Sequence, residues 1–234
     1  MGQLTLIRHG QAHAFAQDSD RLTALGETQA RELGAYWARH ATTFTEAYSG
    51  TLIRQRRTAE LAATAAPLPA LQLNAALNEY DATGILQVLL PKLLSQDPEF
   101  QSLNTAFEQH RQSQDRNRYF QKMFEYLMTR WMSGALTADG VEKFADFQQR
   151  VSQALQAILQ QDGAGRRVAV FTSGGVIGLI VQTALQAPAA QMLALNWRIR
   201  NGSLTEFTFS RERLAFDSFN TLPHLDDPAL WTFR

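Results

Sequence analysis

An apolar segment at residues 4–7 leads directly into Arg8, His9 and Gly10. We expect the segment to be a strand of an α/β sheet, where ligands bind outside the carboxyl ends of the strands. A guanidinium group can form two parallel hydrogen bonds to a phosphate, and a neutral imidazole can attack phosphorus while a backbone carbonyl holds its other nitrogen. Arg8 and His9 are therefore candidates for a phosphate site at this edge, with Gly10 allowing a tight turn there.

A second strand is predicted at residues 167–172, which form a continuous apolar run of the kind found in buried parallel strands. It would bring Ser173, Gly174 and Gly175 to the same edge as His9. A helix is expected over 176–185, and the free amides at its start favour an anion. Ser173 has a simpler interpretation as an ordinary helix N-cap.

The remaining pattern alternates between short strands and amphipathic helices, which indicates an α/β fold. Helices are expected over residues 24–40, 52–62 and 141–161, with Thr23 as the N-cap of the first and Pro67 ending the segment of the second. Strands are expected over residues 47–49 and 71–73, followed later in the chain by an edge hairpin of 204–209 and 214–219. A chain of 234 residues can form one domain with an insertion as readily as two domains.

Residues 91–140 do not continue the alternation and are predicted to form a mainly helical insertion. Its apolar residues recur at spacings of three and four, at Phe120, Met123, Phe124, Leu127 and Trp131. Such a stripe usually packs into a core. Because the insertion follows Glu79, it is also a candidate lid that selects the substrate.

Composition excludes several classes of partner and chemistry. The chain has no cysteine, which excludes disulfides, thiolate catalysis and sulfur-ligated metals. Its net charge is zero, which argues against nucleic acid or an anionic membrane as the main partner. No window of about 18 apolar residues indicates a membrane span, no segment near the start resembles a signal peptide, and no His, Asp or Glu cluster has metal-ligand spacing. We expect a cytoplasmic protein with no metal or other cofactor, whose oligomeric state the sequence does not indicate.

Four motifs together resemble the histidine phosphatase superfamily, in its phosphoglycerate mutase-like branch. They are Leu6-Ile7-Arg8-His9-Gly10-Gln11, which contains the Arg-His-Gly motif, Leu22-Thr23-Ala24-Leu25-Gly26, Leu52-Ile53-Arg54 with Thr58-Ala59-Glu60, and Ser173-Gly174-Gly175-Val176-Ile177. The resemblance covers both ends of the chain and skips the middle. It implies a three-layer α/β/α sandwich with a mainly parallel central sheet, as one domain over residues 1–234 that carries residues 91–140 as a helical insertion or lid.

The resemblance also implies a role for each matching residue. Arg8 and Arg54 would clamp the phosphate of a small phosphorylated substrate, and His9 would be phosphorylated transiently. Glu79 would protonate the leaving oxygen, which requires a carboxyl group that keeps a proton near neutral pH. The alternative interpretation of Glu79 is a solvated carboxylate in a loop.

Further contacts to the phosphate are assigned by the resemblance to Gln11, Ser173 and Gly174. The other two arginines of the same helix, Arg56 and Arg57, are interpreted as a solvated face.

The chain departs from the family pattern at Ser173, where the family has a second histidine that hydrogen-bonds the transferred phosphoryl group. A serine hydroxyl can donate a hydrogen bond but brings no positive charge. His13 or His224 would have to fold in from a loop to replace that histidine. The expected function is a histidine acid phosphatase or phosphoglycerate mutase-like phosphomonoesterase.

Two other functions stay open. One is a binding or regulatory protein that holds a phosphorylated ligand and has lost most turnover. A mutase is less favoured, because that activity requires a site that retains the phosphorylated product against water.

Overall fold

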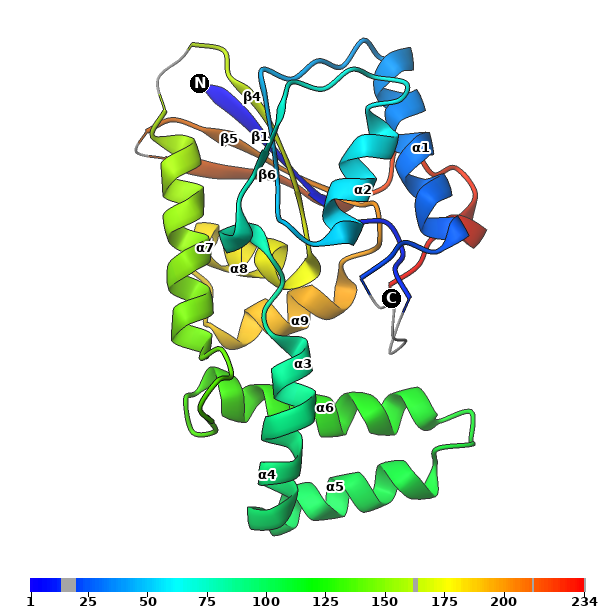
Figure 1. Ribbon diagram of the computed structural model, residues 1–234, viewed down its shortest axis with the longest axis vertical. Coiled ribbons are helices and arrows are strands. Elements are labelled where there is room, and N and C mark those ends of the chain that lie inside the picture. Colours follow the sequence, from blue (N-terminus) through cyan, green and yellow to red (C-terminus); the bar gives the residue numbers. More distant parts are fainter. Residues whose placement is uncertain (14–19, 162–163, 212, 234) are drawn as a thin grey trace. The chain divides into compact units, whose positions relative to one another are not determined.

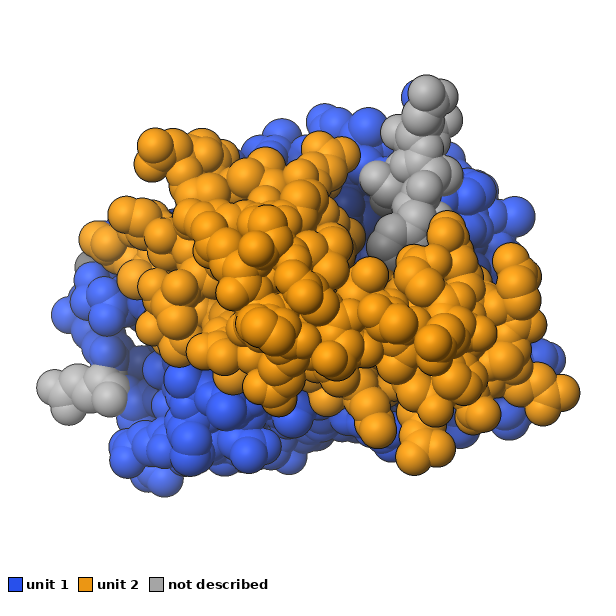
Figure 2. Space-filling model, turned by 90° about the horizontal axis from the view of Figure 1, so that it is seen from below, with its two compact units in different colours: residues 1–79, 150–234 blue, residues 80–149 orange. Residues whose placement is uncertain are grey.

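The computed structural model of the protein describes residues 1–13, 20–161, 164–211 and 213–233. The chain forms two compact units, which Figure 2 shows in different colours. Residues 1–79 and 150–234 make up the first, called the sheet unit below, and residues 80–149 make up the second, the helical unit.

The sheet unit contains one six-stranded sheet in the order β3-β2-β4-β1-β5-β6. The strands are β1 (Gly2–Arg8), β2 (Glu46–Ser49), β3 (Leu71–Leu73), β4 (Arg167–Thr172), β5 (Leu204–Phe209) and β6 (Leu214–Thr221). Strands β3, β2, β4 and β1 run parallel, and β5 and β6 add an antiparallel hairpin at one edge. The predicted α/β fold with a mainly parallel sheet is confirmed.

Helices cover both faces of this sheet (Figure 1). The longer ones are α1 (Ala24–Arg39), α2 (Ile53–Ala62), α7 (Phe144–Leu159), α8 (Gly174–Ala184) and α9 (Ala190–Arg198), and two short 3-10 helices are η1 (Ala75–Leu77) and η3 (Pro228–Leu230). Helices α1 and α2 lie on one face, and α8 and the part of α7 from Arg150 onward lie on the other. The layers are therefore those of an α/β/α sandwich.

The core under α1 and α2 is apolar and fully enclosed. Its buried members are Ile7, Leu33, Trp37, Ala59, Ala62, Ala66, Ala169, Phe171 and Leu204. Burying one such large side chain stabilises the fold by about 1.5–3 kcal/mol. Because Ile7 and Phe171 belong to this core, it fixes the ends of β1 and β4, the two strands that lead to the candidate site.

Helix α1 begins in direct backbone contact with the segment that follows β1. Thr23 caps the helix, and its side-chain oxygen accepts a hydrogen bond from the backbone nitrogen of Gly26 at 3.0 Å. A Cβ atom on Gly26 would lie 2.0 Å from the carbonyl oxygen of Gln11, and one on Gly10 would lie 2.3 Å from the carbonyl oxygen of Gly26. Both positions therefore require glycine.

The helical unit contains the predicted insertion. A continuous helical stretch of α3 (Ala82–Gly84), the π-helical turn η2 (Ile85–Leu89) and α4 (Leu90–Gln96) leads to α5 (Pro98–Gln109) and α6 (Arg116–Met132), and the unit ends within α7. Met123, Phe124, Leu127 and Trp131 are buried and Phe120 is half-buried, so the stripe of α6 packs into this unit's own core. The Trp131 and Phe144 rings meet edge to face at 5.2 Å between centroids. None of the helices in the described ranges is both long and apolar enough to cross a membrane.

The contact between α1 and the segment after β1 gives a direct test. Replacing Gly26 by alanine should lower the free energy of unfolding by about 1–3 kcal/mol, because the new methyl group overlaps the Gln11 carbonyl. Thr28→Ala, at an exposed position of the same helix, should change it by less than about 0.5 kcal/mol. Urea unfolding of both variants measures the difference, and equal midpoints would show that the close approach is not required.

Candidate active site

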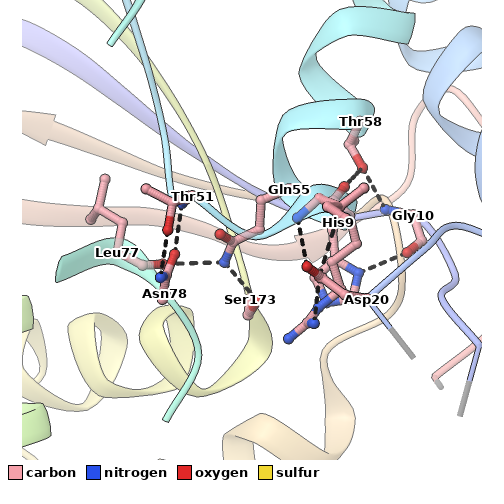
Figure 3. Close-up of polar contacts among 11 residues, drawn as sticks. His9, Gly10, Asp20, Thr51, Gln55, Thr58, Leu77, Asn78 and Ser173 are labelled. Atoms are coloured by element: carbon pink, nitrogen blue, oxygen red, sulfur yellow. Dashed lines mark hydrogen bonds and ion pairs between the residues drawn. The ribbon is translucent and has the colours of Figure 1, made fainter. Parts of the chain in front are cut away.

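The site forms where β1 and β4 end side by side. Arg8 pairs with Thr172 in the parallel register, and the backbone nitrogen of His9 donates to the carbonyl oxygen of Thr172 at 3.0 Å. His9 and Ser173 therefore leave neighbouring strands at the same level of the same edge. Figure 3 shows both residues, with the amide of Gln55 of α2 pointing toward Ser173.

His9 is held as a neutral imidazole with a defined tautomer. Its Nδ1 atom lies 2.7 Å from the carbonyl oxygen of Gly10, which can only accept, so Nδ1 carries the hydrogen and Nε2 has the lone pair. Burial lowers the pKa of His9 well below its usual value, and the positive charges of Arg54 and Arg8 lower it further, against the opposing effect of the Gly10 carbonyl. A buried imidazole with its Nε2 lone pair available is a nucleophile that needs no deprotonation at neutral pH.

Arg54 lies beside His9 and is oriented by Asp20. Its Nε atom donates to His9 Nε2 at 3.2 Å, and its Nη1 atom contacts the Asp20 carboxylate at 2.9 Å. Asp20 also accepts from the backbone nitrogen of Ile53 at 2.8 Å, so it caps the start of α2. Asp20 could not be identified from the sequence, because its partners lie more than 30 positions further along the chain.

Thr58 links α2 to the segment after β1. Its hydroxyl accepts from the backbone nitrogen of Gly10 at 3.1 Å and donates to the carbonyl oxygen of Arg54 at 2.7 Å. The Thr-Ala motif therefore has a physical role here: it fixes the distance between the helix that carries Arg54 and the loop that carries His9.

Arg8 lies across the start of α8 and contacts the C-terminal segment. Its Nη1 atom donates to the carbonyl oxygens of Ile199 and, at 2.9 Å, Phe233. Its guanidinium carbon lies 3.7 Å from the point where a Cβ atom on Gly174 would be. Arg8 and Arg54 therefore approach His9 from different elements, as two cations around one nucleophile.

Two buried amide side chains connect the C-terminal segment to the loop of His9. Gln29 accepts from the backbone nitrogen of Gln11 at 2.8 Å and donates to the carbonyl oxygen of Leu230 at 2.7 Å. Asn201 donates to the carbonyl oxygen of His9 at 3.3 Å and accepts from the Thr232 hydroxyl at 3.0 Å. Neither residue belongs to a motif in the sequence, and only the fold brings them here.

Glu79 is placed at the start of α8. Its Oε2 atom accepts from the backbone nitrogen of Gly175 at 3.1 Å, where the helix dipole favours a negative group. Arg150 of α7 donates to the carbonyl oxygens of Ala76, Asn78 and Glu79 at 2.8 to 3.1 Å. This arginine fixes the backbone that carries Glu79 and was not identified from the sequence.

The other predicted phosphate ligands are Ser173, Gly174 and Gln11, and each has different neighbours in the structure. Ser173 is the N-cap residue of α8, but its side chain forms no capping hydrogen bond and instead accepts from Gln55 Nε2 at 2.8 Å. Gly174 lies next to Arg8. The side-chain oxygen of Gln11 accepts from the Thr23 hydroxyl at 2.9 Å, so contact between Gln11 and phosphate stays a prediction.

Among the residues that the structure describes, neither alternative histidine forms a hydrogen bond with His9, Arg8, Arg54 or Glu79. His13 donates its backbone nitrogen to the carbonyl oxygen of Arg21 at 3.0 Å. His224 is buried, with its ring 6.4 Å from that of Tyr36 between centroids, and within the described ranges neither of its ring nitrogens has a hydrogen-bond partner. Desolvation lowers the pKa of His224 to about 4.

The site therefore combines a neutral imidazole, two cations and a carboxylate around the start of a helix. Such a site is suited to binding a phosphate dianion and transferring a phosphoryl group to nitrogen. In the part of the chain that the structure describes, no group of three or more His, Asp or Glu side chains is arranged to hold a metal ion.

Comparisons with known proteins give a family match and a common fold. A family model described as the histidine phosphatase superfamily (branch 1) matches residues 4–114 and 106–222. No curated protein matches the chain.

Three solved structures illustrate the shared fold. Bacillus stearothermophilus YhfR has a TM-score of 0.66 at 20% identity, over 97% of this chain and 100% of that one. The mycobacterial glucosyl-3-phosphoglycerate phosphatase has a TM-score of 0.61 at 20% identity, over 94% and 98%. A mutant phosphoserine phosphatase of Entamoeba histolytica, in complex with phosphoserine, has a TM-score of 0.60 at 19% identity, over 96% and 100%.

The buried neutral His224 predicts a pH dependence of stability. In the unfolded chain histidine binds a proton near pH 6.5, whereas folded His224 does so only near pH 4. The stabilisation that comes from keeping His224 neutral is therefore fully present above about pH 6.5. As the pH falls toward 4 it is lost, which lowers the free energy of unfolding by about 3 kcal/mol in total. His224→Phe should reduce the loss of unfolding free energy between pH 7 and pH 4.5, measured in urea. Because His9 is present in both proteins, an identical loss in parent and variant would exclude His224 as a cause.

Proposed function

This chain belongs to the histidine phosphatase superfamily (branch 1), and we propose that it hydrolyses phosphate monoesters through a phosphohistidine intermediate on His9. One observation carries the proposal: His9 is kept neutral beside two guanidinium groups, with Nδ1–H bound to the Gly10 carbonyl and the Nε2 lone pair facing Arg54. A site that only bound phosphate would need the arginines, but it would gain nothing from a neutral imidazole of fixed tautomer.

In the first proposed step, Arg8 and Arg54 bind the phosphate dianion and Arg54 exchanges its hydrogen bond with His9 for one with a phosphoryl oxygen. The Nε2 lone pair of His9 attacks phosphorus, so that a P–N bond forms and the ester P–O bond breaks. Glu79, whose protonated form is favoured by the adjacent bound phosphate dianion, gives its proton to the leaving alkoxide oxygen. Glu79 is well placed for this exchange because it lies at the helix start beside Gly174, which adjoins Arg8.

In the second step, a water molecule attacks the phosphorus of phosphohistidine and the P–N bond breaks. The carboxylate of Glu79 takes the proton of that water, which restores the acid, and inorganic phosphate leaves. The two guanidinium groups neutralise the charge of the dianion throughout, so that the proposed steps use no metal or other cofactor.

The proposed substrate is a small phosphate ester. Two of the proteins with a similar fold are named as phosphatases of small phosphate esters. They are a phosphoserine phosphatase in complex with phosphoserine and a glucosyl-3-phosphoglycerate phosphatase. We propose that residues 91–140 act as a lid that selects among such esters. Helices α4 to α6 belong to a separate compact unit. This supports the proposal, because such a unit can change in sequence without disturbing the sheet that carries His9.

The serine at position 173 favours a second candidate, a phosphate-ester-binding protein with little turnover. Removing one preorganised donor to a developing oxyanion typically slows an enzyme by about 100- to 1,000-fold. A serine hydroxyl replaces the hydrogen bond but not the charge of a histidine, so this chain is expected to turn over slowly.

Trapping the intermediate tests the proposed function. The protein is mixed with p-nitrophenyl phosphate, quenched without acid and digested, and mass spectrometry should locate the phosphoryl group on His9. Arg54→Gln should slow turnover at least about 100-fold, since a charged contact to the phosphoryl group is lost. Arg57→Gln, which lies in the same helix and pairs with Glu27, should keep the parent rate.

Two results would contradict the proposal. One is a phosphoryl group on another residue, and the other is an undiminished rate in His9→Ala. Binding of phosphate without any hydrolysis across a panel of esters would support the second candidate instead.

A further inference from the structure

Gln55 is a buried polar residue of α2 that the steps above do not use. It follows Arg54, and its side chain turns into the protein toward the end of β4 (Figure 3). Its Nε2 atom donates to Ser173 Oγ at 2.8 Å and to the carbonyl oxygen of Leu77 at 3.2 Å. Burying an amide without satisfying both of its ends is costly, and in the described chain Gln55 Oε1 has no hydrogen-bond partner. The position of Gln55 therefore calls for an explanation.

The contact with Leu77 fixes the orientation of the amide. A backbone carbonyl oxygen can only accept, so the atom that faces it must be the NH2 group of Gln55. The same NH2 group then donates to Ser173, whose oxygen accepts. The Leu77 carbonyl also accepts from the Thr172 hydroxyl at 2.7 Å, so both of its lone pairs are used.

Ser173 is consequently left with a hydrogen to donate. Its oxygen is already an acceptor for Gln55, and no described residue accepts a hydrogen bond from it. The residues beside it face the candidate site, because His9 is level with Ser173 on the next strand, Gly174 adjoins Arg8 and Gly175 binds Glu79. A phosphoryl oxygen bound at this edge is the acceptor that the Ser173 hydroxyl requires.

We propose that Gln55 is a positioning residue: by donating to Ser173 Oγ, it commits the serine hydroxyl to donate to the phosphoryl group. The inference rests on the proposed function for the identity of the ligand. It also explains how an uncharged residue serves at position 173, because a hydroxyl polarised by a donor is itself a stronger donor.

The space that Gln55 fills gives the proposal a second consequence. Its Oε1 atom lies 1.9 Å from the point where a Cβ on Gly50 would be, so the amide fits only against a glycine. Replacing Gln55 by alanine removes as many non-hydrogen atoms as replacing Ser173 by histidine adds. Because Gln55 Nε2 lies 2.8 Å from Ser173 Oγ, an imidazole at position 173 that extended in the direction of this oxygen would overlap the Gln55 amide. We therefore expect a histidine at position 173 to be tolerated only together with a smaller residue at position 55.

A double-mutant cycle tests the coupling, using Gln55→Leu, Ser173→Ala and the double variant. Two quantities are measured for each, the dissociation constant of inorganic phosphate by calorimetry and kcat on p-nitrophenyl phosphate. When Ser173 is present, Gln55→Leu should raise the dissociation constant of phosphate about tenfold and lower kcat about tenfold. An effect of this size corresponds to the loss of about one hydrogen bond to a charged ligand. In the Ser173→Ala background the same change should have less than about a twofold effect.

A matched control separates positioning from a general packing defect. Thr172→Val removes the other side-chain hydrogen bond to the Leu77 carbonyl but leaves the contact between Gln55 and Ser173. It should lower the melting temperature while phosphate affinity stays within about twofold of the parent.

The outcomes of the cycle distinguish this inference from the proposed function. Equal effects of Gln55→Leu in both backgrounds would overturn the inference, whether or not the parent hydrolyses esters, because phosphate binding is measured directly. A parent that binds phosphate with the expected coupling but never turns over would support the inference and contradict the phosphatase. A parent that binds no phosphate would overturn both.

Exchanging the pair gives an independent check. Ser173→His alone should lower the melting temperature and should not raise kcat, because Gln55 fills the space. Gln55→Ala with Ser173→His should have a kcat at least about tenfold above that of either single variant. A Ser173→His single variant as stable as the parent, with a higher kcat, would show that Gln55 does not occupy the required volume.

Discussion

The parallel pairing of β1 with β4 is the constraint on which the candidate site depends. It sets Arg8 against Thr172 and joins His9 to the carbonyl of Thr172, so one register decides which residues leave the sheet together. A shift by one residue would turn alternate side chains to the opposite face. Because Ile7 and Phe171 are fully buried in the core under α1 and α2, such a shift would remove them from this core, and hydrophobic packing thereby maintains the geometry of the polar site.

Backbone carbonyl groups position Arg8 and Arg150, whereas the Asp20 carboxylate orients Arg54. Arg8 donates to the carbonyls of Ile199 and Phe233, and Arg150 donates to three carbonyls of the segment that ends at Glu79. A carbonyl oxygen orients a guanidinium group without cancelling its positive charge. The pKa of His9 is lowered by burial first and then by the positive charges of Arg54 and Arg8. The same field that keeps the nucleophile neutral would attract a phosphate dianion.

Much of the fold could be predicted from local patterns in the sequence. The apolar run of β4 gave its bounds, Arg167–Thr172, and the cap at Thr23 gave the start of α1, because both signals are contained in a few consecutive residues. Helix α8 begins at Gly174, two residues before the predicted start, since Ser173 is the last residue with an extended backbone. Helix α7 begins at Phe144, three residues after the predicted start, and α9 was not predicted.

The motifs located Arg8, His9, Arg54 and Glu79 in the sequence, but not the residues that hold them. Gln55 and Ser173 are 118 positions apart, and Gln29 is 201 positions from Leu230. Contacts of this kind leave no periodicity or local spacing in a single sequence. The helical character of residues 91–140 was visible in their pattern, whereas a lid role depends on long-range geometry that no pattern reports.

The hydrogen bond from Arg8 to the carbonyl of Phe233 spans 225 positions of the chain. During translation, Arg8 therefore leaves the ribosome long before the segment that orients it has been made. Strand β1 likewise waits for β4, its parallel neighbour, which is synthesised more than 150 residues later. A nascent chain thus carries the histidine and both arginines well before it can orient Arg8, so the complete candidate site would form only after the segment around Phe233 has been made.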